Sequence, residues 1–387
     1  MTLQDVTFEA GFGSTMFDGS PSWTDITAYV RQFRSTRGRT SVEGRFDTGT
    51  AFLVVDNRDG RFTPDNTAGA YYPNVLLGVP IRVVESDASE PIFYGSVRGW
   101  PPSYPKTQDS YATVPLADGF YNLNLEDLHG ETYSLESTDE RITSVLDDIS
   151  WPAGLRDLDA GVANVQATSF GAPQDGGEQP VLQHLLDVAE AEVGHLFMSR
   201  DGNVTFKNRV AQSGASASVN LTDANMQELT VSYDDDHFFN DIRVAREDGA
   251  QITYVDATSV SNFGRRVLTR DVMPMATDAE ALNVAEWLSY LFGEQRLRID
   301  GLKLKMYPGA PHYADVLGLE LRDYINVNHV PPGGDTLSQD CSVEGIRHEM
   351  TPGDWTVYLT VAPLATVETQ SYWILGTSAL DVSTRLA

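Results

Sequence analysis

Two residues of this 387-residue sequence could form the nucleophile and the base of a cysteine amidase: Cys341, the only cysteine, and His348. A reactive cysteine usually lies at the N-terminus of a helix, which lowers the pKa of its thiol. Cys341 instead begins a predicted strand, so we expect a buried and unreactive thiol. The seven histidines are scattered, and none is paired at the spacing of metal ligands.

The acidic segment Asp56–Gly60 is a candidate calcium site, because Ca²⁺ prefers carboxylate oxygens as ligands. An EF-hand loop that begins at Asp56 needs a glycine where Arg61 stands and a glutamate where Thr67 stands. The match therefore fails. The Asp-Gly pair at the end of the segment predicts a tight turn after a strand instead.

The sequence also lacks the motifs of common enzymes: it has no phosphate-binding loop, no H-E-x-x-H zinc motif and no G-x-S-x-G nucleophile elbow. We therefore predict no catalytic residue, no metal and no cofactor, and we expect a protein that is not an enzyme. One alternative stays open. Among the 55 acidic residues, a pair of carboxylates could cleave a polysaccharide.

The formal net charge of −28 argues against a general nucleic-acid-binding protein and against attachment to anionic membranes, because both need clustered cations. An acidic wall would instead repel phosphate and let DNA slide past. Five arginines interrupt this acidity within fifteen residues whose only acid is Glu43: Arg31, Arg34, Arg37, Arg39 and Arg45. This arginine cluster is expected either to contact an acidic surface of a neighbouring subunit or to form a solvated strand edge.

No stretch of the sequence approaches eighteen consecutive apolar residues, and residues 1–14 lack the basic start and apolar run of a signal peptide. We therefore expect neither a signal peptide nor a membrane-spanning segment. A single cysteine excludes a disulfide within the chain, so burial must hold the fold, as suits assembly inside a cell.

Hydrophobic periodicity predicts a mainly β protein with an α+β insertion. Residues 1–125 are expected to form a first β-barrel, and residues 126–228 an α+β domain with two helices and a hairpin. Residues 229–365 are expected to form a second β-barrel that carries one helix, and residues 366–387 a C-terminal tail. Two apolar strands broken by glycine each precede a hairpin and an alternating strand. This internal similarity favours two related barrels, and a chance resemblance between two β segments is the alternative.

Local signals place several elements within these regions. Ser137–Glu140 is a capping box that predicts the start of one helix, and Pro180 predicts the start of another. A second capping box and Gly293 bound a predicted helix at Thr277–Phe292. The phase of hydrophobic alternation changes at Asp300–Gly301, which predicts a β-bulge.

Seven segments of the N-terminal third occur in an order and spacing typical of one protein family: Trp23–Arg31, Arg37–Arg39, Gly49–Ala51, Val55–Pro64, Tyr71–Pro73, Pro80–Val83 and Ile92–Val97. Through them the chain resembles the minor tail proteins of siphophage tail tips, especially those of phages that infect actinobacteria. The resemblance continues more thinly through Leu185–Phe206 and Val343–Leu359.

This resemblance implies a baseplate hub, a structural protein that joins the tail tube to the tail tip and lines the DNA exit channel during genome ejection. The implied fold has two tube-like β-barrels that flank a smaller mixed domain. The implied assembly is a homotrimer in the virion, put together in the host cytoplasm. Its implied partners are the distal tail protein, other tail-tip proteins and phage DNA that passes without specific binding, through a channel that we expect to be acidic.

Large amphipathic and charged side chains in the matching segments are the candidates for the assembly interface. They are Trp23, Asp25, Tyr29, Arg31, Arg37, Arg39, Asp56, Asp59, Arg61, Tyr71, Tyr72 and Trp100. Packing in the local core is an equal alternative for any single aromatic residue. Alternative functions are a hexameric distal tail adaptor, a carbohydrate-binding tip module and a cell-wall hydrolase, which copy number, glycan binding and wall lysis would distinguish.

Overall fold

The computed structural model describes residues 5–106, 109–172, 176–210, 216–233, 236–293 and 295–364, and two short strands beyond them. These strands, β27 (Ser371–Trp373) and β28 (Thr384–Leu386), pair in parallel. The rest of the predicted C-terminal tail, residues 366–387, lies outside the described residues.

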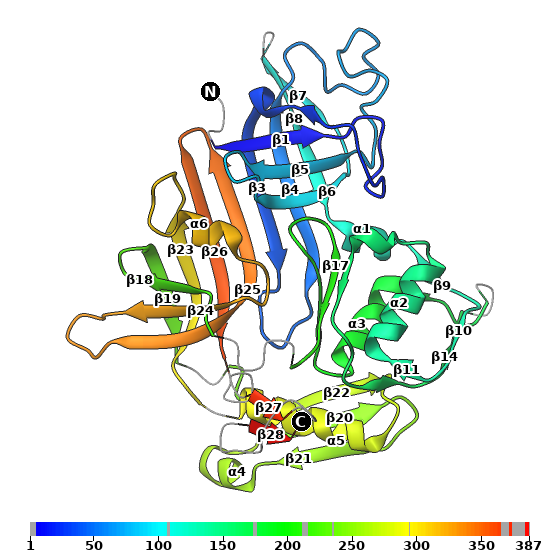
Figure 1. Ribbon diagram of the computed structural model, residues 1–387, viewed down its shortest axis with the longest axis vertical. Helices are drawn as coiled ribbons and strands as arrows, with labels where there is room; N and C mark the ends of the chain where they lie inside the picture. Colours follow the sequence, from blue (N-terminus) through cyan, green and yellow to red (C-terminus); the bar gives the residue numbers. More distant parts are fainter. Residues whose placement is uncertain are drawn as a thin grey trace.

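Half of the described strands, including most of the long ones, belong to one sheet of fourteen strands (Figure 1). From the N-terminal part of the chain come β1 (Val6–Ala10), β2 (Thr24–Asp25), β3 (Val30–Gly38), β4 (Asp47–Asp56), β5 (Pro80–Glu85), β6 (Pro91–Val97), β7 (Pro102–Lys106) and β8 (Asp109–Ala117). From the C-terminal part come β18 (Val219–Thr222), β19 (Met226–Ser232), β23 (Arg298–Lys305), β24 (Tyr324–His329), β25 (Leu337–Thr351) and β26 (Asp354–Pro363). The main path runs β19-β23-β26-β25-β3-β4-β8-β6-β5-β1-β2, with β24 and then β18 attached to β25, and β7 attached to β8.

The strands that the structure describes form no closed barrel, so the prediction of two separate barrels was wrong. The two β regions instead continue into one another, because β3 pairs antiparallel with β25 from Phe33 opposite Met350 to Gly38 opposite Gly345. On their other sides, β3 pairs with β4 and β25 pairs with β26. Hydrophobic alternation shows that a strand is half buried, but it does not show which edge the strand will meet.

Alternation gives this sheet one buried face and one open face. On β4, Ala51, Leu53 and Val55 are buried, whereas the intervening Phe52 and Val54 remain partly exposed. The same pattern runs through β26 on the other side of the junction. Burial of each large apolar side chain contributes about 1.5–3 kcal/mol, so the buried face anchors the sheet and the open face is free for another role.

The bulge predicted at Asp300–Gly301 is present where β23 lies against β19. Gly301 pairs with Thr230 and Ile299 pairs with Val231, so Asp300 is the extra residue. The bulge returns the apolar residues on both sides of it to the same core, which explains the change of phase in the sequence.

The middle region packs two helices beside a small sheet. As predicted, α2 (Thr138–Asp148) begins at the capping box of Ser137 and Glu140, and α3 (Val181–Glu190) follows Pro180. The other elements here are α1 (Gly119–Leu123), β9 (Asp127–Leu128), β10 (Thr132–Tyr133), β11 (Glu136–Ser137), η2 (Ala153–Leu155), β12 (Arg156–Leu158), β13 (Asn164–Val165), β14 (Thr168–Ser169), β15 (Gln179–Pro180), β16 (His195–Met198) and β17 (Val204–Lys207). The apolar faces of α2 and α3 belong to the same core as the main sheet.

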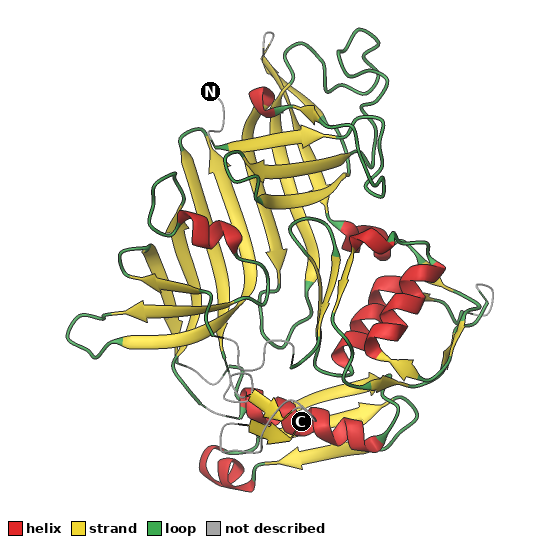
Figure 2. Ribbon diagram, viewed as in Figure 1, coloured by secondary structure: helices red, strands yellow, loops and turns green. Residues whose placement is uncertain are grey.

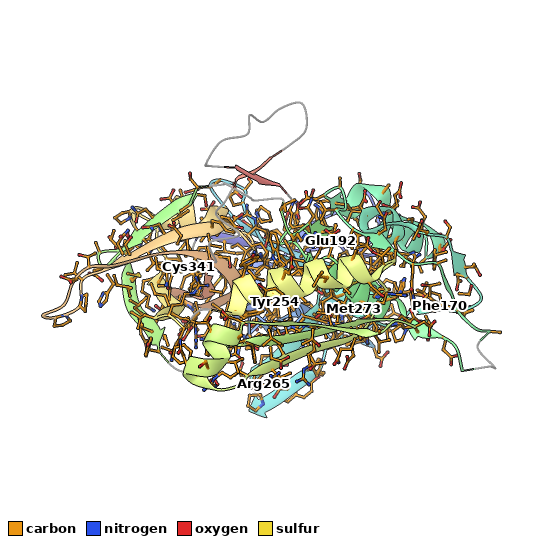
Figure 3. All side chains as sticks on the ribbon, turned by 90° about the horizontal axis from the view of Figure 1, so that it is seen from below. Phe170, Glu192, Tyr254, Arg265, Met273 and Cys341 are labelled. Atoms are coloured by element: carbon orange, nitrogen blue, oxygen red, sulfur yellow. The ribbon has the colours of Figure 1, made fainter. Side chains whose placement is uncertain are left out.

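A second core lies under α5 (Asp278–Phe292), whose predicted capping box of Thr277 and Glu280 is also present. It is shared with a three-stranded sheet of β21 (Gln251–Val255), β20 (Asp241–Arg246) and β22 (Val267–Met273). Figure 3 shows α5 along this sheet, with Tyr254 and Met273 beside it.

Figure 2 shows the longer helices in two places, α2 with α3 and α5 with its sheet. The sequence did not indicate α4 (Ala257–Phe263) and α6 (Tyr313–Gly318), because one or two turns are too short for a helical period to be recognised. A 3₁₀ turn, η1 (Thr27–Tyr29), precedes β3. None of the helices in the described part of the chain is long and apolar enough to cross a membrane.

Candidate assembly surfaces

The two β regions meet where β3 lies against β25 (Figure 1). Gly38 and Gly345 face each other at the end of this pairing, next to bulges in both strands. Gly38 has a φ of +105°, and a Cβ atom there would collide with the carbonyl oxygen of Glu344. Only glycine allows two backbones to approach so closely at this φ, so the junction depends on Gly38.

A buried group of charges fixes the junction inside the chain. The Glu344 carboxylate accepts a hydrogen bond from Arg39 Nε at 2.7 Å and one from Arg322 Nη1 at 2.6 Å. Ser342 also donates to this carboxylate. Burial alone would raise the pKa of Glu344, but the two guanidinium groups outweigh this effect and lower it to about 2. Glu344 is therefore ionised at neutral pH and ties β3 to β25.

Arg37 is paired inside the chain in the same way. Its Nη1 lies 2.7 Å from Glu320 Oε1 and donates to the carbonyl oxygen of Met198 at 3.3 Å. Arg37 lies on the same buried face of β3 as Phe33. The two residues are four positions apart, and an even spacing places side chains on one face of a strand, so the sequence already indicated that Arg37 is buried. The acidic partners of Arg37 and Arg39 thus come from the C-terminal half of the same chain.

In the acidic turn after β4, the carboxylate of Asp56 pairs with arginine side chains of the same chain. Asp56 accepts hydrogen bonds from Arg58 and lies 3.2 Å from Arg31 Nη2. Desolvation would raise the pKa of Asp56, but hydrogen bonds from Arg58 and Arg31 outweigh it and lower the pKa to about 2. The Gly60 N–H donates to the carbonyl oxygen of Asn57 at 2.9 Å, which closes the turn predicted from the sequence.

Arg31 and Arg45 have further partners. Arg31 Nη2 lies 3.0 Å from Asp109, and Arg45 Nη2 lies 2.7 Å from Asp187 of α3 and also contacts Glu190. Each of the five arginines of the cluster consequently has an acidic partner in its own chain.

Most of the aromatic candidates pack on one another beside this turn. The Arg61 guanidinium lies 3.8 Å from the centre of the Tyr29 ring. Phe62 stacks on Trp100 with 5.7 Å between ring centres, and Tyr71 lies 5.3 Å from Phe62. Trp100 is buried. These contacts form an aromatic cluster that stabilises the long loop between β4 and β5.

Several side chains at the edge of this cluster remain exposed. Tyr72 is 45% exposed, Leu76 57% and Leu77 70%. Asp59 is exposed as well, and it pairs with Arg61. Apolar side chains gathered at one loop are typical of a contact surface, so this loop is an apolar part of the predicted interface that the chain itself leaves uncovered.

The first matching segment, Trp23–Arg31, runs through β2 and η1 into the start of β3. Trp23 is half-buried, with the Arg82 guanidinium 4.5 Å from its ring centre and the Tyr94 ring at 6.3 Å. Asp25 is exposed and accepts a hydrogen bond from the backbone N–H of Thr27 at 2.8 Å. Both residues thus have local structural roles.

The open face of the main sheet is a surface that the sequence did not indicate. A hollow of about 540 Å³ is bordered by residues of β19, β23, β26, β25, β3 and β4. Its floor contains Gly301, Thr360 and Gly345, which stand next to one another on adjacent strands. Alternation indicates which residues point outward, but not that these six strands lie side by side.

The pair considered for cysteine chemistry does not form. Cys341 and His348 both lie on β25, seven residues apart, which is roughly 23 Å along an extended strand. Cys341 is buried, as expected, and burial raises the pKa of its thiol. His348 accepts a hydrogen bond from Trp355 Nε1 at 3.2 Å, and burial, with the charges of Arg37 and Arg200, lowers its pKa to about 3.

In sequence, the chain matches no protein-family model and no curated protein. In structure, it is similar to a tail protein from Neisseria meningitidis MC58, with a TM-score of 0.62 and 12% identity over 94% of this chain and 98% of that one. It is also similar to the 43 kDa tail protein of prophage MuSo2 from Shewanella oneidensis, with a TM-score of 0.57 and 15% identity over 92% of this chain and 98% of that one.

A third similar structure is an E. coli component of the type VI secretion system, described as structurally similar to the T4 bacteriophage tail proteins gp27 and gp5. The TM-score is 0.50, with 8% identity over 89% of this chain and 78% of that one. At these identities the likeness establishes the fold. This chain therefore shares its mainly β fold with phage tail proteins.

Proposed function

We propose that this chain is a structural component of a phage tail tip, a hub that joins the tail tube to the tip and lines the DNA exit channel. The observation that carries the proposal is the open face of the main sheet, where two sets of antiparallel strands from opposite ends of the chain are joined at β3 and β25. The fold shared with phage tail proteins supports it.

The ends of the sheet support a ring of three copies in the virion. Among the strands that the structure describes, four pair on one side only: β19, β7, β2 and β18. The longest of these edges is β19, and β7 lies at the opposite, N-terminal part of the sheet. Open strand edges of this kind are usually covered by a neighbour. With β19 of one copy beside β7 of the next, three copies would present six sets of strands to one axis and would match a sixfold tube and a threefold tip.

The partners proposed for this ring follow from the same arrangement. The exposed loop with Tyr72, Leu76 and Leu77 is the surface proposed for the distal tail protein or another tip protein. DNA would pass along the open face of the sheet. In this proposal the main sheet, whose strands come from residues 6–117 and 219–363, forms the ring, and the middle region with α2 and α3 makes contacts around it.

A cryo-EM reconstruction of the assembled chain tests this proposal directly. Three copies around one axis, with the open face of the sheet toward the axis, are expected. Six copies would favour the hexameric adaptor, and an open face that points away from the axis would contradict the channel. Glycan binding or lysis of host cell wall by the purified chain would instead favour the carbohydrate-binding module or the hydrolase.

A substitution on the open edge of β19 tests the ring independently. Val231 is 39% exposed on β19, and Val267 is 40% exposed on β22, away from this edge. Val231→Lys should weaken assembly at least about tenfold, because a charge without a partner costs several kcal/mol in an interface. Val267→Lys should leave it unchanged. Sedimentation velocity over a concentration series measures both, and an equal effect of the two variants would contradict the proposed edge.

A further inference from the structure

The open face of the main sheet carries balanced charges, although the chain as a whole has a net charge of −28. Four cations stand at its outward positions: Lys303 and Lys305 on β23, Arg347 on β25 and Arg34 on β3. Four acids share this face: Glu228 on β19, Glu349 on β25, Asp354 at the start of β26 and Asp47 on β4, which borders the hollow. The first three pair with the four cations. The face therefore departs from the acidic channel that we expected from composition.

The two arginines of this face share one acid. Arg34 Nε lies 3.3 Å from Glu349 Oε1, and Arg347 Nε lies 3.7 Å from the same oxygen. The Arg347 guanidinium also lies 3.8 Å from the ring centre of Tyr358 on β26. Both cations are thereby paired with groups on the sheet itself.

The two lysines are paired separately. Lys303 Nζ lies 3.8 Å from Glu228 Oε2. Lys305 contacts Asp354 and donates to Thr356 Oγ1 at 2.7 Å. These are half of the four lysines in the whole chain, and each has an acid on the neighbouring strand or turn.

Stability does not account for these pairs. All seven side chains are between 31% and 67% exposed, and exposed ion pairs contribute only about 0–1 kcal/mol. Much of the rest of the face consists of short hydroxyl and small apolar side chains, such as Thr36, Thr50, Thr113, Thr360, Val54 and Pro115. Such a face offers phosphate hydrogen-bond partners but few free cations.

We propose that this face is a sliding surface for duplex DNA, on which Glu228, Glu349 and Asp354 occupy the cations and keep them from phosphate. The inference rests on the proposed function, because only a face that lines the channel meets DNA. Each cation that neutralises a phosphate strengthens DNA binding through counterion release. A cation already paired with a carboxylate must break that pair first, so DNA is not retained as it passes.

The test removes the three acids and leaves the cations in place. The guard variant is E228Q/E349Q/D354N in the full chain. Its matched control is D147N/D157N/D278N, which removes three exposed acids paired with Arg156, Lys207 and Arg246 elsewhere on the molecule. Both variants change the net charge equally. In the control, Arg156 and Arg246 lose their acids, and Lys207 loses one of two, because Asp159 remains 3.5 Å from its Nζ.

The measurement is fluorescence anisotropy of a labelled duplex of about 20 base pairs over a salt series. Four freed cations should give the guard variant a slope of log affinity against log salt near −3.6, because each phosphate contact contributes about −0.9. We expect a slope no steeper than about −1 for the wild type and the control. At low salt the guard variant should bind DNA at least about tenfold more tightly than either.

Two outcomes would overturn the sliding surface: DNA binding by the wild type that equals the guard variant, or an equal gain by the control. The proposed function is tested separately by the reconstruction of the assembly. A face that points away from the axis would remove the channel whatever the DNA result. A face that lines the axis, with no gain in the guard variant, would overturn only the role of the three acids.

Discussion

Replacement of Glu344 by glutamine removes one charge from the junction and almost no volume. In the wild type, this carboxylate is buried between Arg39 at 2.7 Å and Arg322 at 2.6 Å. Glu344→Gln leaves two buried guanidinium groups without their anion. Breaking a buried ion pair from one side destabilises a protein by about 3–5 kcal/mol, so we expect the free energy of unfolding to fall by that amount at neutral pH.

The contribution of the Glu344 charge to the free energy of unfolding also depends on pH. The folded chain holds the pKa of Glu344 at about 2, below the ordinary value of 4.5. This difference corresponds to roughly 3 kcal/mol, at about 1.4 kcal/mol for each pKa unit. Because the pKa is lowered by folding, this stability is fully present above pH 4.5 and is lost as the pH falls from 4.5 toward 2. The difference in the free energy of unfolding between the wild type and Glu344→Gln should therefore become smaller as the pH falls from 4.5 toward 2.

Urea denaturation at several pH values measures the loss, and hydrogen exchange of the β3 and β25 amides shows whether it is local to the junction. The matched control is Glu349→Gln, five residues along the same strand, whose side chain is 36% exposed and pairs with Arg34. It should change stability by less than about 1 kcal/mol. A loss below 1 kcal/mol in Glu344→Gln, or a gap that stays constant on acidification, would refute the reasoning.

Two further predictions concern backbone space and thiol reactivity. Gly38→Ala should lower the free energy of unfolding by at least about 2 kcal/mol, because φ is +105° and the new methyl group would collide with the Glu344 carbonyl oxygen. The control is Gly301→Ala, where a methyl group would make ordinary contacts only and should cost less than about 1 kcal/mol. Thermal denaturation compares the two variants. Cys341 should resist iodoacetamide in the folded chain and react only after unfolding, because burial keeps its thiol protonated. Mass spectrometry detects the adduct. Rapid labelling of the folded chain would contradict the buried site.

The features that the sequence predicted well are local. Two capping boxes, the turn after β4 and the bulge at Asp300 depend on residues close together in the chain, so their signals survive in a short window. The aromatic residues of the matching segments were predicted as an assembly interface, with packing in the local core as the alternative. Most of them contact one another within the chain.

The features that the sequence did not predict depend on which strands meet. The pairing of β3 with β25 joins residues about 310 positions apart, and no local pattern reports it. The balanced open face has the same origin, because Glu228, Lys303 and Arg347 become neighbours only through strand order. One buried arginine of the cluster could have been predicted from the sequence. Arg37 points to the same face of β3 as the apolar Phe33, and a buried guanidinium group requires an acidic partner.

The buried charges also explain why β3 and β25 pair in this register. A shift by one residue would turn Phe33 outward and is excluded by burial alone. A shift by two residues would keep Phe33 inside, and apolar packing discriminates weakly against it. It would, however, separate Arg37 from Glu320 and Arg39 from Glu344, and each buried charge left without its partner costs several kcal/mol. The ion pairs thus exclude the even-numbered shifts that hydrophobic alternation permits, and they fix how the two β regions form one open face.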